Sequence, residues 1–372
     1  MAAAIGEALA ASRRLAIVSG GSKAGVGAPT EATPLPLAGL RGIVDYDPAE
    51  LVLTVRPGTP LREIEDLIAA ERQMLAFEPF DHGPVFGRLA GEATIGGVVA
   101  AGVAGSRRVS AGGARDHLLG LRAVSGRAES FVAGAKVVKN VTGYDLPKLA
   151  AGSWGRLFAM TELTLKVLPR PEMTWTVAVD GLAVDAAVRA MAQAMGSPAD
   201  VAAAAHCPAQ GDGPARTTLR LEGFGPSVIA RARLLETVLA PFGPAYDLDA
   251  ATADGVWSDL RTLRPLAGSA PLWRINVPPR AGASLIAALA GGGDRWLMDW
   301  AGGLVWILDD GDPERVRSAA LAGGGHATLM RGPDMLRATV PAFHPPVAGL
   351  AALEERVRRA FDPAGVFETG RF

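Results

Sequence analysis

The chain is poor in cysteine, with Cys207 alone among 372 residues. A disulfide needs two cysteines, and CxxC-type zinc sites and iron–sulfur clusters need several thiolates. The sequence therefore excludes an internal disulfide and a self-contained cluster of either kind. Histidine is also scarce, and no two histidines stand at metal-ligand spacing, so we expect no metal site. The five are His82, His117, His206, His326 and His344.

The sequence lacks an excess of charge of either sign and lacks a long apolar run. Lys and Arg total 37 against 38 Asp and Glu, a net charge of -1. This balance provides neither a basic surface for nucleic acid nor a polybasic membrane anchor. The longest weakly polar stretch, Ala93–Ser106, is shorter than the roughly 20 residues that span a bilayer. We expect no nucleic-acid partner, no transmembrane segment, no signal peptide and a cytoplasmic location.

Arginine supplies nearly all of the positive charge, and the chain has only five lysines. Lys23 lies in the Gly-rich segment VSGGSK, and the other four lysines are Lys136, Lys139, Lys148 and Lys166. An ammonium is a compact point charge, whereas a guanidinium is a rigid fork, so the two are not interchangeable at an anion site. Lys23 is therefore a candidate anion ligand, with chance in a small sample as the alternative.

The length and the alternation of elements predict two α+β domains. A chain of 372 residues exceeds one ordinary core, and Pro169 and Pro171 mark the expected boundary. The second domain should hold an antiparallel sheet. Helix 61–73 is expected to have Thr59 as its cap and Pro60 at its first position. Further expected helices are 2–12, 146–156, 182–195, 226–240, 312–322 and 350–361. Expected strands are 15–18, 43–46, 51–56, two within 118–132, 159–167, 175–179, 217–221, 273–277, 297–300 and 304–308.

The loop Ser19-Gly20-Gly21-Ser22-Lys23 follows the first strand directly. Consecutive glycines allow several backbone N–H groups to point at one oxyanion, and the hydroxyls and the lysine add donors and charge. A flexible surface turn is the alternative. Prolines and glycines after the loop prevent an immediate helix, which argues against a Rossmann crossover, and no GxxxxGK[ST] is present.

A run of small residues, 93–102, contains Thr94, Gly96 and Gly97. Each glycine weakens a helix by roughly 0.5–1 kcal/mol, so the missing side chains must serve either close helix packing or a flat ligand on the backbone. Arg107 and Arg108 follow, and suit a phosphate, an acidic partner or solvent.

Two other segments are polar or glycine-rich. Gly152–Gly155 precedes strand 159–167, where it suits a ligand held at the strand edge or an ordinary turn. A polar cluster beside it shows no evident general acid and base pair. Its members are Asn140, Thr142, Tyr144, Asp145 and Lys148.

Taken in order, these segments resemble one family of flavoproteins. The Gly loop, PGTPL, EATIGGVVAAGVAGSRR, GARDHLLGLRAVSG, KVVKNVTGYDLPKLAAGSWGRL and TELTLKVLPRP are similar to the vanillyl-alcohol oxidase / p-cresol methylhydroxylase (PCMH) superfamily. Within it, the chain resembles the FAD-binding E-type subunits of bacterial glycolate oxidase. LWRINVP, MDWAGGLVWI, GGGHATLMR and the tail FDPAGVFETGRF add weaker matches.

The resemblance implies a PCMH-type FAD-binding domain of two α+β subdomains at 1–171, an α+β cap domain at 172–345 and a C-terminal segment, 346–372, that returns to the FAD domain. Ser19–Lys23 would hold the pyrophosphate with Thr94, Gly96 and Gly97. The full implied FAD-binding set is Ser19, Gly20, Gly21, Ser22, Lys23, Pro79, Thr94, Gly96, Gly97, Ala101, Gly102, Ser106, Gly152, Ser153, Gly155 and Glu162.

The chain departs from the family in three ways. It lacks the HxxxxxxH-type metal and substrate motif of the related catalytic subunits and D-lactate dehydrogenases. No histidine or cysteine stands in the first loop, so FAD should be bound non-covalently. Glu368-Thr369 stands where the family usually has Asn-Pro.

The resemblance predicts a subunit of a glycolate (2-hydroxy-acid) oxidase complex, with a catalytic D-type flavin subunit and an iron–sulfur subunit as partners. The complex would be cytoplasmic or peripheral to the inner membrane. Catalytic residues are not identifiable from the sequence. Two alternatives stay open at this point: a non-catalytic assembly subunit that binds FAD structurally, and a stand-alone FAD-dependent hydroxy-acid dehydrogenase.

Overall fold

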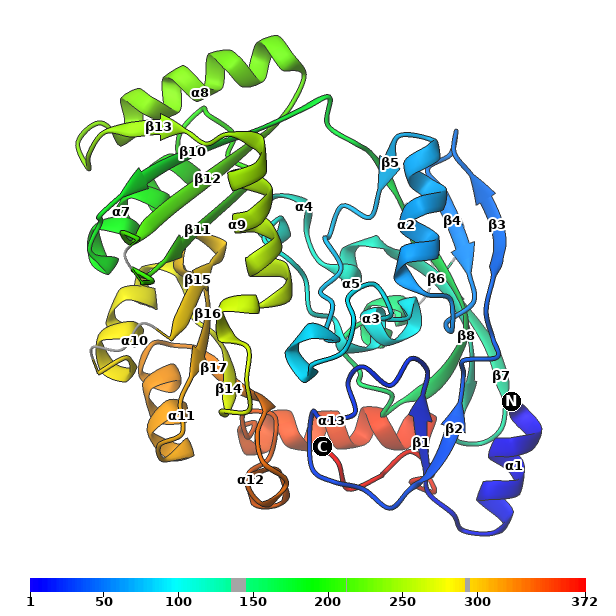
Figure 1. Ribbon diagram of the computed structural model, residues 1–372. Coiled ribbons are helices and arrows are strands. Elements are labelled where there is room, and N and C mark those ends of the chain that lie inside the picture. Colours follow the sequence, from blue (N-terminus) through cyan, green and yellow to red (C-terminus); the bar gives the residue numbers. More distant parts are fainter. Residues whose placement is uncertain (135–144, 212, 292–294) are drawn as a thin grey trace. The chain divides into compact units, whose positions relative to one another are not determined.

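The computed structural model describes residues 1–134, 145–211, 213–291 and 295–372 (Figure 1). The chain divides into two compact units, each described here by itself. The first unit comprises Met1–Ala104, Gly112–Arg170 and Pro345–Phe372. The second unit comprises Gly105–Ala111 and Pro171–His344. Sequence analysis assigned 105–111 to the first domain, whereas its contacts group it with the second unit.

The first unit is built on a five-stranded antiparallel sheet in the order β3-β4-β8-β6-β7. Its helices are α1 (Ala2–Ala10), α2 (Leu61–Ala70), α3 (Ile95–Ala101), α5 (Ala114–His117), α6 (Leu146–Ala150), α13 (Ala348–Phe361) and the 3₁₀ helix η1 (Pro84–Phe86). Its strands are β1 (Leu15–Val18), β2 (Thr33–Pro36), β3 (Ile43–Asp47), β4 (Val52–Val55), β5 (Gln73–Met74), β6 (Leu118–Ser125), β7 (Ser130–Gly134), β8 (Phe158–Lys166) and β9 (Leu168–Pro169).

Helix α2 packs on this sheet because its apolar residues recur at helical spacing. Leu61, Ile64 and Ile68 lie on one face of the helix and are at most 1% exposed. They join Leu163 and Leu165 of the central strand β8 in one core. Side chains alternate along a strand, so these two leucines, two residues apart, point to the same side of the sheet.

A smaller core joins the two ends of the chain. β1 and β2 pair in parallel, and Leu15 and Leu35 pack with Val366 and Phe367 of the tail. The backbone N–H of Leu15 donates to the carbonyl of Val366 at 2.7 Å. The C-terminal residues are therefore an integral part of the first unit.

The second unit is an eight-stranded antiparallel sheet in the order β13-β10-β12-β11-β15-β16-β14-β17. One face of it packs against helices α7, α8, α10 and α11. Its helices are α4 (Arg108–Ala111), α7 (Val184–Met195), α8 (Gly225–Leu239), α9 (Ala250–Thr262), α10 (Gly282–Leu289), α11 (Pro313–Ala322), α12 (Asp334–Thr339) and the 3₁₀ helices η2 (Arg264–Leu266), η3 (Pro279–Ala281) and η4 (Trp300–Gly302). Its strands are β10 (Met173–Asp180), β11 (Ala203–Cys207), β12 (Arg216–Gly223), β13 (Ala245–Asp247), β14 (Leu272–Asn276), β15 (Trp296–Asp299), β16 (Leu304–Leu308) and β17 (His326–Arg331).

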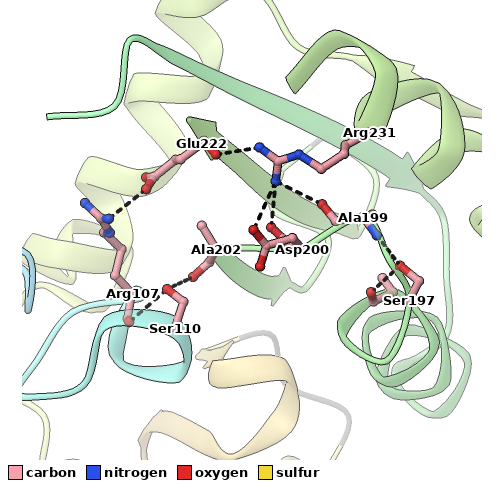
Figure 2. A network of polar contacts seen from close by, with 9 residues as sticks. Arg107, Ser110, Ser197, Ala199, Asp200, Ala202, Glu222 and Arg231 are labelled. Atoms are coloured by element: carbon pink, nitrogen blue, oxygen red, sulfur yellow. Dashed lines mark hydrogen bonds and ion pairs between the residues drawn. The ribbon is translucent and has the colours of Figure 1, made fainter. Parts of the chain in front are cut away.

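The segment Gly105–Ala111 is anchored to the second unit by polar contacts (Figure 2). Arg107 forms an ion pair with Glu222 of β12 at 3.0 Å, and the two side chains are only 13% and 10% exposed. The hydroxyl of Ser110 donates to the carbonyl of Ala202 at 2.8 Å. Loss of one member of a shielded ion pair leaves an uncompensated charge, so this anchor resists separation. The sequence left a phosphate, an acidic partner or solvent open for Arg107. The structure shows an acidic partner, Glu222.

Two local predictions were wrong, and one helix was missed. Thr59 does not cap α2, since the helix begins after Pro60 and the Thr59 hydroxyl donates instead to the carbonyl of Arg56 at 2.8 Å. The helix expected over 146–156 ends at Ala150, because the following backbone turns at glycines with positive φ. Helix α9 was not expected at all. In the part of the chain that the structure describes, no helix is both long and apolar enough to cross a bilayer.

Asp362 should be essential for the anchoring of the tail. Its carboxylate is 4% exposed and accepts the backbone N–H groups of Val366 at 2.9 Å and Phe367 at 2.7 Å. Asp362→Ala leaves both donors unsatisfied, so we expect the free energy of unfolding to fall by about 1–3 kcal/mol. Chemical denaturation measures this change, with the exposed Glu354→Ala as the matched control. Equal stability of the two variants would contradict the assignment.

Candidate functional site

The first unit contains a cavity of about 120 Å³ next to the Gly-rich loop. The loop after β1 forms one wall, and the start of α3 forms a second. The remaining walls come from the turn around Gly155 between α6 and β8, from β8 and from the tail. The lining residues are Ile17, Val18, Ser19, Gly20, Gly21, Ser22, Lys23, Ala24, Leu37, Pro57, Thr94, Gly96, Gly97, Ala100, Ala101, Trp154, Gly155, Phe158, Met160, Arg371 and Phe372.

The backbone of the loop at Gly20 lies close to Thr94, so a side chain at this position would be crowded. A Cβ on Gly20 would lie 3.0 Å from the carbonyl oxygen of Glu92 and 3.1 Å from Thr94 Cγ2. The N–H of Gly20 points at Thr94 Oγ1 at 3.4 Å. Gly21 has φ +70°, a conformation that favours glycine. The loop and the start of α3 therefore form one polar cradle.

Three side chains supply donors to this cradle. Ser22 is 5% exposed, and its Oγ lies 3.3 Å from Lys23 Nζ. The Oγ of Ser19 is shielded from solvent and has no hydrogen-bond partner among the described residues. A buried hydroxyl without a partner is costly, so this atom indicates a site that is completed by a ligand.

Lys23 is a half-buried residue whose ammonium is largely shielded from water. Burial lowers the pKa of its ammonium to about 8, and the negative charge of Asp81 opposes this shift. Asp81 is itself 3% exposed and accepts backbone N–H groups from Gly83 at 2.8 Å and Gly91 at 2.6 Å. The cradle thus holds a positive charge that an anionic ligand would stabilise.

The tail fixes the backbone of the loop. Arg371 donates from Nε to the carbonyl of Val26 at 2.6 Å and from Nη2 to the carbonyl of Lys23 at 2.5 Å. The N–H of Ala28 donates back to the carbonyl of Arg371 at 2.9 Å. Phe372 then packs on Trp154, with the ring centroids 5.3 Å apart. Trp154 has φ +54°, which is unusual for a residue with a side chain.

The glycines of the small-residue run 93–102 have different surroundings: some pack against other backbone segments, and one faces the cradle. A Cβ on Gly96 would meet Pro57 Cβ at 2.5 Å, and a Cβ on Gly102 would meet Gly152 Cα at 2.9 Å. These two glycines therefore serve close packing. A Cβ on Gly97 would instead lie 3.3 Å from Lys23 Nζ, inside the cradle. Close packing is therefore the role of Gly96 and Gly102, whereas a ligand on the backbone at Gly97 stays a prediction.

Ten of the residues that the sequence suggested for the site lie in the cavity wall. They are Ser19, Gly20, Gly21, Ser22, Lys23, Thr94, Gly96, Gly97, Ala101 and Gly155. The others lie elsewhere. Gly102 packs on Gly152, and the N–H of Gly152 donates to the carbonyl of Val99 at 3.1 Å. Ser153 lies in the same turn, and its backbone carbonyl accepts the N–H of Arg156 at 3.0 Å.

Three further suggested residues are also outside this wall. Pro79 forms a β-bridge with Ala104. Glu162 pairs with Arg122 at 3.3 Å. Ser106 belongs to the second unit, where its hydroxyl donates to Asp299 Oδ2 at 2.7 Å. Lys136, Lys139, Asn140, Thr142 and Tyr144 lie outside the described residues.

Sequence reasoning missed Leu37, Pro57, Trp154, Arg371 and Phe372 in the wall. The tail motif pointed to contact with the FAD domain but not to individual residues. The ranges that the structure describes contain no group of three His, Cys, Asp or Glu side chains suited to a metal ion.

Comparison with known proteins identifies the family. Residues 1–134 match a family described as an FAD binding domain. The chain is 34% identical over 371 residues to glycolate oxidase subunit GlcE of Escherichia coli, covering 99% of this chain and 95% of that protein. The chain belongs to the GlcE family. It is thus a member of a family of FAD-binding oxidoreductases, as its sequence motifs predicted.

Other relatives match only part of this GlcE-family chain. Glycolate oxidase subunit GlcD of Bacillus subtilis is 33% identical over 147 residues, which are 40% of this chain and 30% of that protein. The D-lactate dehydrogenase of Anaerostipes hadrus is 36% identical over 138 residues, 37% of this chain and 27% of that protein.

Solved structures confirm the fold class. The structure of p-cresol methylhydroxylase with substrate bound has a TM-score of 0.73 at 14% identity, covering 100% of this chain and 86% of that chain. Alkyldihydroxyacetonephosphate synthase has a TM-score of 0.67 at 13% identity, covering 99% and 74%. The α+β expectation, with an antiparallel sheet in the second unit, is confirmed.

The cradle is chemically suited to the diphosphate of FAD. The unpartnered Ser19 hydroxyl and the Lys23 ammonium provide a donor and a charge. The missing side chain of Gly97 leaves the space between Lys23 and Thr94 open. Backbone donors, hydroxyls and a lysine are the groups that bind phosphate oxygens.

The pKa of Lys23 can be measured directly in the FAD-free protein. Reductive ¹³C-methylation of the lysines and NMR should show one resonance that titrates near pH 8, assigned by its loss in Lys23→Arg. Because Asp81 raises this pKa, Asp81→Asn should move the midpoint to lower pH. The exposed Asp66→Asn is the control. A Lys23 midpoint unchanged by Asp81→Asn would contradict the electrostatic coupling.

Proposed function

We propose that this chain is the FAD-binding subunit of a multi-subunit glycolate (2-hydroxy-acid) oxidase or dehydrogenase. It takes part in the oxidation of glycolate to glyoxylate, and the electrons pass to a partner iron–sulfur subunit. The partners in this proposal are a catalytic D-type flavin subunit and that iron–sulfur subunit. The main observation in support is the 34% identity to glycolate oxidase subunit GlcE across 99% of the chain.

In this proposal the cradle binds the FAD diphosphate. Lys23 and the Ser19 and Ser22 hydroxyls bind phosphate oxygens, and Arg371 keeps the loop backbone in place through the carbonyls of Val26 and Lys23. FAD is bound non-covalently, because the cavity wall presents no histidine or cysteine that could attach to the flavin. The apolar side chains of Leu37, Phe158 and Met160 exclude water from the same cavity.

The need for a partner follows from electron transfer. When bound, FAD supplies the capacity to take up two electrons from a substrate and to pass them on singly. An iron–sulfur cluster needs several cysteine thiolates, and this chain has only Cys207. Burial raises the pKa of the Cys207 thiol to about 12, so this side chain is a protonated, unreactive thiol at neutral pH. In this proposal the electrons therefore pass to another chain.

The absorption spectrum of the purified full chain tests the proposal. We expect a flavin spectrum, and release of all the flavin on acid denaturation, because no covalent bond holds it. Glycolate alone should not bleach the flavin if the D-type partner oxidises the substrate. A folded but colourless protein would refute FAD binding, and bleaching without partners would indicate a stand-alone dehydrogenase.

Gly97→Val should abolish FAD retention. The added side chain would occupy the cradle, since even a Cβ at this position lies 3.3 Å from Lys23 Nζ. Gly39→Val is the matched control, because a Cβ there meets nothing within 4 Å. The flavin-to-protein absorbance ratio measures retention, and circular dichroism checks the fold. Normal retention in Gly97→Val would remove this part of α3 from the FAD site.

A further inference from the structure

One face of the sheet in the second unit carries an arginine on β14, next to the edge strand β17. In β14, Trp273 and Ile275 face the hydrophobic core. Side chains alternate along a strand, so Arg274 lies on the opposite face. Its direct cross-strand neighbours are Trp306 of β16 and Thr328 of β17.

Arg274 is held in position by side chains that do not neutralise its charge. Its Nη1 donates to Asn276 Oδ1 at 2.6 Å. The guanidinium carbon lies 5.3 Å from the ring centroid of Trp300 and 5.8 Å from that of Trp306. Its Nε is shielded from solvent without a hydrogen-bond partner in the described ranges. Among the described side chains, no carboxylate pairs with Arg274.

The Trp300 ring lies beside two guanidinium groups because its backbone is strongly constrained. Trp300 has φ +53°, in the left-handed region that non-glycine residues seldom adopt. Its backbone N–H donates to Asp299 Oδ1 at 2.7 Å, and its indole N–H donates to the carbonyl of Gly105 at 3.0 Å. Arg108 lies 5.9 Å from the same ring. Strained residues that are held by several contacts cluster at functional sites.

The electrostatic neighbours that shift the pKa of Arg274 and of His326 are themselves basic groups. Burial and the neighbouring Arg108 lower the pKa of Arg274 to about 10. Burial, Arg274 and His344 lower the pKa of His326, which lies opposite Asn276 on β17. Both shifts arise mainly from desolvation, and the neighbouring basic groups disfavour the charged form further. A buried charge without a counter-ion is costly, and a bound anion would remove that cost.

We infer that Arg274, oriented by Asn276 and Trp300, binds the carboxylate of a small 2-hydroxy or 2-oxo acid. The inference rests on the proposed function, which supplies the class of ligand. A guanidinium presents a planar fork of N–H donors that matches a carboxylate in bidentate geometry. The shielded Nε belongs to this fork, and a carboxylate would satisfy it.

Isothermal titration calorimetry on the full chain tests this inference, with glycolate, oxalate and sulfate as probes. Wild type should bind oxalate and glycolate, and these ligands should raise its melting temperature. Arg274→Met should weaken binding by about ten-fold or more, because a charged hydrogen-bond pair is lost. Arg274→Lys keeps the charge but loses the fork, and should bind with intermediate affinity. Arg280→Met, an exposed arginine of the same unit, is the matched control.

Several outcomes would overturn the inference. They are unchanged carboxylate binding in Arg274→Met, an equal loss in Arg280→Met, and equal affinity of wild type for sulfate and oxalate. Flavin content separates this test from that of the proposed function. If Arg274→Met lost FAD, then Arg274 would serve the cofactor and not a carboxylate. If wild type bound carboxylate without FAD, the subsite would stand while the proposed function failed.

Discussion

The contact of Arg371 with the carbonyls of Lys23 and Val26 joins the two ends of the chain at the site. The Gly-rich loop has no regular structure of its own, and glycines leave a backbone with much freedom to lose on folding. A rigid guanidinium fork from the tail holds the loop carbonyls on one side. The loop hydroxyls and the Lys23 ammonium remain on the cavity side. The cradle thus depends on a residue almost 350 positions away in the sequence.

Both units place a cation where water is largely excluded. Burial lowers the pKa of Lys23 in the first unit and of Arg274 in the second. Desolvation of a charge is unfavourable unless a partner compensates it. Asp81 compensates Lys23 in part, whereas no carboxylate of the described residues pairs with Arg274, which lies beside the Trp300 and Trp306 rings and the Asn276 amide. Such positions are suited to anionic ligands, and this explains why they persist in a folded protein.

Strongly patterned segments were predicted well from the sequence. Leu15–Val18 and Leu304–Leu308 are strands with the expected bounds, because short apolar runs between turn residues suit buried strands. The Ser19–Lys23 loop lies in the cavity wall as its glycines suggested. Helix α9 was missed, because its apolar residues are few and its buried face is decided by the sheet below it.

The sequence by itself determined the fold class, the family and the loop that lines the cavity, because these depend on local patterns and motifs. The tertiary structure alone decided which glycines serve packing and which leave space, as Gly96 and Gly97 show. Only the tertiary structure shows that Gly105–Ala111 belongs to the second unit. Likewise, only the structure shows that Arg371 contacts the loop. The physical reason is that close approach, burial and charge compensation arise between residues distant in sequence. Local sequence patterns do not specify which distant residues come into contact.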